Sequence, residues 1–223
     1  ASGAQNGALA NSFANTGRDA INMAGTIQPA YVSLPSDSFS RQMTIAARLI
    51  NANLGIRVLS VYLDNFDNHS GEAPDHAAQL TKLDAGLSAF YGNLQPAYRG
   101  RTTIATFSEF GRRPKVNGSA GTDHGTTSCM FVIGDMVKGG LYGQHQSLTD
   151  LDRDGNFKST VDFRMVYASL LSGWLKADAS GILGANYGDL QLFNGDPTES
   201  APGEDHGIPT FGGKNGDNGG YWL

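Results

Sequence analysis

Apolar side chains recur along this chain at two spacings, one typical of helices and one typical of strands. Three stretches have the three- and four-residue steps of a helix with one buried face: 38–54, 80–94 and 163–174. Gly55 is placed to end the first helix, and Thr160 or Asp162 is placed to cap the third. A further small-residue helix is predicted over Ala10–Ala24, followed by a loop punctuated by prolines.

Short segments rich in β-branched and aromatic residues alternate with these helices. They are RVLSVYL at 57–63, TTIATF at 102–107 and CMFVI at 129–133, each of a strand's length. Cys129, the only cysteine, is expected to be a buried strand thiol, and a single cysteine excludes an intrachain disulfide. Alternating strands and helices predict an α/β fold, a mostly parallel sheet flanked by helices.

Two polar runs follow two of the predicted strands directly. DNFDNH follows residues 57–63, and SEFGRRPKVNGSAGTDHG follows residues 102–107. Because ligands gather beyond the carboxyl ends of parallel strands, both runs are expected to line one crevice. The candidate metal ligands are Asp64, Asp67, His69, Glu109, Asp123 and His124.

The chemistry of these side chains suits a divalent ion such as zinc or manganese. Two such ions about 3.5–4 Å apart can clamp a phosphoryl or sulfuryl group and activate a nucleophile. The alternative is that the Asp and Asn residues serve only as turn formers. Arg112 either holds an anionic substrate oxygen or forms a salt bridge with Glu109, and a structural role is favoured for Arg113.

Four stretches together resemble a known family. LDNFDNHSG, LTKLDAGLSAFYGNL, TTIATFSEFGRRPKVNGSAGTDHG and STVDFRMVYASLLSGWL resemble, in this order, an uncharacterised family of bacterial exported proteins within the alkaline-phosphatase-like superfamily. The resemblance covers roughly residues 38–193 and corresponds to the C-terminal half of that fold. It implies a twin-arginine export signal, a periplasmic or extracellular location, and a metal-dependent hydrolase of phosphate or sulfate esters.

The resemblance leaves two alignments open for the ligands. In the first, Asp123 and His124 match the Asp-His pair of the superfamily, and His145 is the final ligand. In the second, which keeps the strand-loop-strand order, residues 108–110 stand at that pair and His124 is the final ligand. Phe110 then stands where the superfamily has a histidine, so the second alignment implies a single-metal site.

The organisation predicted is one α/β domain over residues 1–193, made of residues 1–37 and a family-like core over 38–193. Residues 194–223 form an extension rich in Gly, Asp and Asn, including His206. Residues 1–37 contain no counterpart of the superfamily's first strand with its nucleophile. An upstream segment is therefore expected to supply it; the alternative is a non-catalytic structural or assembly protein with a degenerate fold, stabilised by calcium.

The calcium hypothesis comes from DLDRDGNFKSTVD at 150–162. The opening D-x-D-x-D-G follows the start of a calcium-binding loop, with Val161 where a closing Glu is usual. The expected calcium ligands are Asp150, Asp152, Asp154 and Asn156.

Charge and hydropathy limit the partners. The formal net charge is −5, and the 16 Lys and Arg residues are scattered, so nucleic acid is not expected. No apolar run has the roughly 18 residues that a membrane span needs. The remaining expected partners are a small anionic ester substrate or a second copy of the chain.

Overall fold

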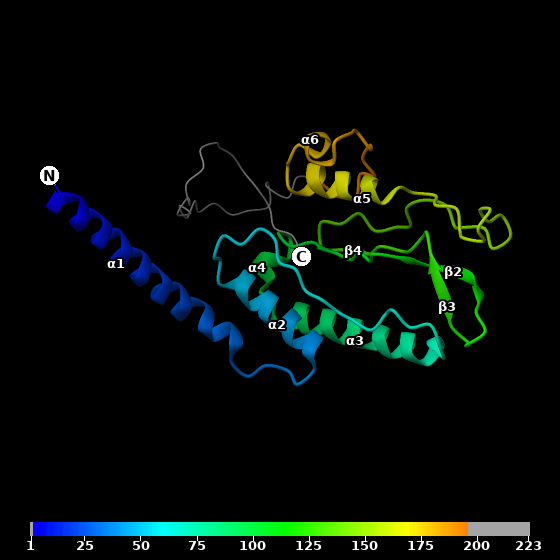
Figure 1. The fold of residues 1–223 in the computed structure, drawn as a ribbon, viewed down its shortest axis with the longest axis horizontal. Helices are drawn as coiled ribbons and strands as arrows, with labels where there is room; N and C mark the ends of the chain where they lie inside the picture. The colour runs from blue at the N-terminus through cyan, green and yellow to red at the C-terminus, as the bar shows by residue number, and fades with distance from the viewer. Residues whose placement is uncertain (1, 196–223) are drawn as a thin grey trace.

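Two helices packed against each other form the centre of the fold. The computed structural model describes residues 2–195, and Figure 1 shows α2 (Ser38–Asn51) and α3 (Glu72–Asn93) side by side. The helices predicted over 38–54 and 80–94 are thereby confirmed, with α3 beginning earlier than its apolar stripe. The buried core is made of Phe39, Met43, Ala46, Ala47, Phe90, Leu94 and Ile104.

The predicted fold class is wrong. The described strands form two small antiparallel sheets of two strands each: β1 (Ile104–Ala105) with β4 (Val132–Ile133), and β2 (Gly111–Val116) with β3 (Thr122–Gly125). A short segment rich in β-branched and aromatic residues indicates an extended chain, but it does not specify the strand with which that segment pairs or the direction of pairing. A mostly parallel sheet flanked by helices is therefore not what these segments build.

The segment 57–63 illustrates this limit. It is extended, and Leu59, Val61 and Leu63 pack on the helical core, yet it belongs to neither two-stranded sheet. The prediction for Cys129 is wrong, since the residue is exposed and lies before β4 rather than within it. The segment 57–63 nevertheless leads directly into the polar run that begins at Asp64.

The N-terminal part of the described chain lies apart from this core. Helix α1 (Ser2–Ile27) projects away from the body of the fold, and the 3-10 turn η1 (Gln28–Tyr31) joins it to α2 (Figure 1). A short helix, α4 (Pro96–Arg99), precedes β1. The small-residue helix predicted over Ala10–Ala24 is confirmed as part of α1.

A second group of helices follows the sheets. Helix α5 (Phe163–Ser169) continues into a π-helical turn (Leu170–Trp174), and α6 (Ala179–Leu183) packs on α5. Asp162 rather than Thr160 is the N-cap, since its side chain accepts a hydrogen bond from the backbone N–H of Arg164. The helix predicted over 163–174 is confirmed, with the π-turn as its only irregularity within the described residues.

Asp162 also forms an ion pair with the side chain of Arg164, and this pair predicts a pH dependence of stability. Hydrogen bonds from the Arg164 guanidinium and backbone lower the pKa of Asp162 to about 2. Because the folded-state pKa lies below the ordinary value of 3.8, the stabilisation is complete above that value and is lost as the pH falls towards 2.

We expect Asp162→Asn to lower the melting temperature at pH 7. The difference in melting temperature between the variant and the wild type, measured by circular dichroism, should shrink between pH 4 and pH 2. A difference that stays constant down to the acid limit would contradict the assignment.

Two sequence-based expectations concern the ends and the membrane. Within residues 2–195 no helix is both long and apolar enough to span a bilayer. The extension predicted over 194–223, including His206, lies outside the described residues except for its first two positions.

Candidate metal centre

The candidate site lies where a loop meets a β-hairpin. The loop, residues 64–71, connects the extended segment 57–63 to the start of α3, and the hairpin consists of β2, β3 and the turn between them. Gly121 lies at the closest approach, because a Cβ built there would overlap the carbonyl group of His69. A glycine is therefore required for the hairpin to lie on the loop.

Backbone hydrogen bonds join the hairpin turn to the N-terminus of α3. Gly71 N donates to Ser119 O at 2.9 Å, and Glu72 N donates to Ala120 O at 3.1 Å. The N-cap of α3 is Gly71, which adopts the left-handed conformation. As a glycine, it has no side chain to cap the helix. The turn carbonyls thus satisfy N–H groups that a helix N-terminus otherwise leaves without partners.

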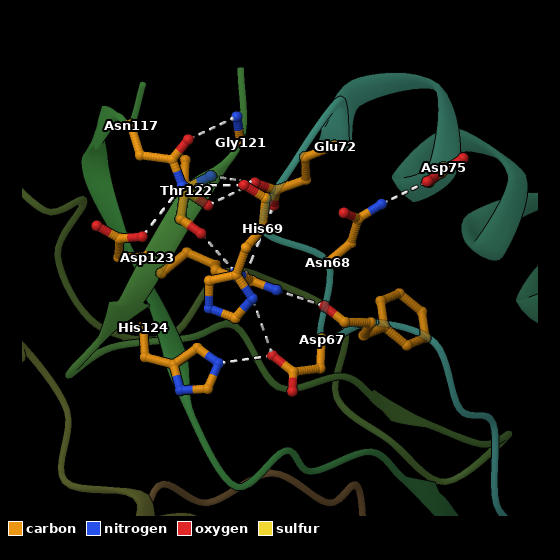
Figure 2. Close-up of polar contacts among 12 residues, drawn as sticks. Asp67, Asn68, His69, Glu72, Asp75, Asn117, Gly121, Thr122, Asp123 and His124 are labelled. Atoms are coloured by element: carbon orange, nitrogen blue, oxygen red, sulfur yellow. Dashed lines mark hydrogen bonds and ion pairs between the residues drawn. The ribbon is translucent and has the colours of Figure 1, made fainter. Parts of the chain in front are cut away.

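Asn117 adds side-chain contacts between the two pieces. Its Nδ2 donates to His69 O and to Asp123 Oδ1, both at 3.0 Å, and its Oδ1 accepts from the backbone of Ser119 and Gly121. Asn117 therefore shapes the turn and holds the backbone of His69 at the same time (Figure 2).

Glu72 and Arg112 form a partly buried group of polar contacts beside the site, which supports the hairpin. Glu72 Oε2 accepts from both the N–H and the hydroxyl of Thr122 at 2.6 Å, and Arg112 donates to Thr122 O at 2.6 Å and Phe66 O at 2.5 Å. Burial acts to raise the pKa of Glu72, but the Thr122 hydrogen bonds and the Arg112 charge outweigh it and leave that pKa lowered. Glu72 is thus an ionised anchor for the hairpin.

Asp67, His69 and His124 converge next to this support. His124 Nε2 lies 2.7 Å from Asp67 Oδ1, and His69 Nδ1 lies 3.4 Å from the same oxygen. One ligand atom from each residue lies within 4.8 Å of the others, and Figure 2 shows the three side chains pointing toward one another. The hydrogen bond from His124 is the main cause that lowers the pKa of Asp67.

The cluster has the donor set of a divalent transition-metal site. Two imidazole nitrogens and one carboxylate oxygen are the protein ligands of one class of catalytic zinc centre, and the same combination binds non-haem iron. The three side chains are between 43% and 63% exposed, so water or a substrate can reach the remaining coordination positions. An open site of this kind is typical of catalytic rather than structural metals.

The other predicted ligands do not join this cluster. Asp64 accepts a hydrogen bond from Asn65 at 2.7 Å, and Glu109 is an exposed residue of the bend before β2. Asp123 pairs with Asn117, because neighbouring side chains of a strand point to opposite faces and His124 takes the face of the cluster. His145, the final ligand in the first alignment, contacts Gln146 O instead.

Arg112 is placed differently from the predicted substrate-binding role. Its guanidinium donates hydrogen bonds to two backbone carbonyls. Its carboxylate neighbour is Glu72, with Arg112 Nε 3.8 Å from Glu72 Oε1, rather than the predicted Glu109. Its side chain is only 22% exposed. The geometry gives Arg112 a structural role in joining the hairpin to the loop.

The segment predicted to bind calcium is held by hydrogen bonds among its own residues. Asp152 accepts from the backbone of Asp154 and Asn156 and from the Asn156 amide, and Asp150 pairs with Lys158 at 2.5 Å. Those two carboxylates therefore already have donors as partners. Among residues 2–195 the only convergent group of three His, Cys, Asp or Glu side chains is the cluster of Asp67, His69 and His124.

Two residues that support the site, Glu72 and Asn117, were not predicted as functional. Phe110 was considered only as a residue in the place of a histidine ligand, whereas it stacks on His124. Nothing in the local sequence indicates that Glu72 faces Thr122, since the two lie 50 residues apart.

The chain belongs to a family described as "Protein of unknown function (DUF1501)", whose model matches residues 6–163, more than half of the 223 residues. This match includes the loop and the hairpin that form the cluster. Comparisons with curated proteins and with solved structures found no match.

Proposed function

We propose that Asp67, His69 and His124 bind one divalent metal ion, zinc or manganese, and that this chain is part of an exported enzyme that hydrolyses phosphate or sulfate esters. The convergence of these three side chains is the observation that carries the proposal. The choice of ester substrates and an exported location rests on the resemblance to the alkaline-phosphatase-like superfamily.

The residues of the chain have distinct roles in this proposal. Asp67 faces both histidines and is ionised at neutral pH, which supplies the negative charge that an ion needs. A bound divalent ion would polarise an ester oxygen and lower the pKa of a coordinated water. Protons compete with a metal ion for imidazole nitrogens, so metal affinity is expected to rise with pH.

Elemental analysis of His69→Ala and His124→Ala tests the site. We expect near-stoichiometric metal in the wild type and a loss of affinity greater than the ~10–100-fold that removal of a supporting residue causes. His145→Ala is the matched control, because His145 is exposed and lies outside the cluster. Equal metal content in all four proteins would overturn the proposed site.

Activity is measured separately on the same proteins. Hydrolysis of an aryl phosphate and an aryl sulfate should depend on added zinc or manganese and disappear in both cluster variants. A wild type that binds metal but leaves both esters intact would retain the metal centre and reject catalysis by this chain alone. Appearance of the protein in the cytoplasmic fraction alone would reject export.

A further inference from the structure

Only one ring nitrogen of the His124 imidazole, Nε2, has a hydrogen-bond partner within the described residues. A metal-binding histidine usually donates its second ring N–H to a carboxylate or carbonyl, and this contact sets the ring plane. His124 directs Nε2 at Asp67, and within the described residues no hydrogen bond to its Nδ1 is found. The side chain is also 46% exposed, so tight packing on all sides does not hold it.

Phe110 stacks on this ring. The two ring centroids lie 3.8 Å apart and the planes differ by 13°. The hairpin register brings them together, because His124 is paired with Arg112 and Phe110 lies two residues before Arg112. Diagonal neighbours of this kind are within reach of aromatic side chains.

Phe110 is itself held by Arg112. The Arg112 guanidinium carbon lies 5.1 Å from the centroid of the Phe110 ring, a cation–π distance. Since Arg112 is fixed to Thr122 O and Phe66 O, the chain of contacts runs from the loop through Arg112 and Phe110 to His124. The stack is thereby tied to the same support that joins loop and hairpin.

We infer that Phe110 is a positioning residue that sets the plane of the His124 ring and so aims Nε2 at the ligand atoms of Asp67 and His69. The inference rests on the proposed metal site. A nearly parallel ring at 3.8 Å resists rotation of the imidazole about its bond to Cβ. The lone pair of Nε2 lies in the ring plane, and rotation would therefore turn it away from the ion.

Phe110→Leu is the test variant, because leucine keeps an apolar side chain but cannot stack. Phe110→Tyr keeps the stack, and Phe107→Leu is the matched control, since Phe107 is a neighbouring aromatic that is 69% exposed. Cobalt(II) is the probe, titrated into each full chain while its visible d–d absorption is recorded.

We expect Phe110→Leu to weaken cobalt binding by about 10–100-fold and to change the d–d spectrum, as loss of a supporting residue does. Phe110→Tyr and Phe107→Leu should match the wild type in both respects. An unchanged affinity and spectrum in Phe110→Leu would overturn the inference. A general loss of structure would lower affinity without the selective rescue by tyrosine.

Metal-free NMR separates this inference from the proposed function. In the wild type, nuclear Overhauser contacts should link the rings of His124 and His69, which lie 4.7 Å apart between centroids. Phe110→Leu should lose these contacts while backbone contacts between Arg112 and His124 persist. Retained ring contacts in Phe110→Leu would reject the positioning role even if no cobalt binds, whereas a wild type that shows the contacts but binds no metal would reject only the metal centre.

Discussion

Gly121→Ala is expected to separate His124 from Asp67 and His69 and thereby to abolish tight metal binding. A methyl group at this buried position would overlap the carbonyl carbon and oxygen of His69 and lie 2.8 Å from Ser70 N. These are backbone atoms, so no side-chain rotation relieves the overlap. The hairpin must move away from the loop, which breaks the contacts of Gly71 and Glu72 with the turn.

The expected cost of Gly121→Ala follows from overpacking at a backbone contact. Forcing extra volume into a packed site typically costs about 1–3 kcal/mol. For a chain of this length each kcal/mol lowers the melting temperature by roughly 2–4 °C. Metal affinity should fall more than the stability alone would suggest, because the ligands lie on the two pieces that move apart.

Gly118→Ala is the control in the same turn. Gly118 is exposed, and no atom lies within 4 Å of its added Cβ. It should bind metal like the wild type and change the free energy of unfolding by no more than about 0.5 kcal/mol. Gly121→Ala with wild-type metal affinity would show that the hairpin does not need this close approach to form the site.

Gly86→Ala is expected to destabilise the helical core. Gly86 is buried in α3, and a Cβ there would overlap the ring of Phe39 in α2 and lie 3.3 Å from Met43 Cγ. The two helices must separate or Phe39 must leave its rotamer, at a cost of about 1–3 kcal/mol. Alanine's higher helix propensity returns only ~0.5–1 kcal/mol of this.

Two further variants isolate the contact between Gly86 and Phe39. Gly92→Ala, exposed on the same helix with no atom within 4 Å of its Cβ, should leave stability unchanged or slightly raise it. Combining Gly86→Ala with Phe39→Leu should cost less than the sum of the two single changes, measured by urea unfolding. Strict additivity would show that the methyl group and the ring do not collide.

The helices of this protein could be predicted from the sequence because their determinants are local. Apolar residues at helical spacing define the buried faces of α2 and α3, and Asp162 caps α5 within two residues of its partner. The sheet could not be predicted in this way. The β-branched and aromatic residues of 57–63 and 102–107 indicate an extended chain, and both antiparallel pairing and no pairing satisfy that prediction.

The candidate site was likewise predicted in part from the sequence and decided in part by the tertiary structure. The sequence by itself determined that Asp67, His69 and His124 are potential ligands, since the types of side chain and their place in polar runs can be read directly. Only the tertiary structure decided that these three converge while Asp64, Glu109 and Asp123 do not. Convergence depends on contacts such as Glu72 with Thr122 and Gly121 with the backbone of His69, which join residues about 50 apart and leave no periodic signal in the sequence.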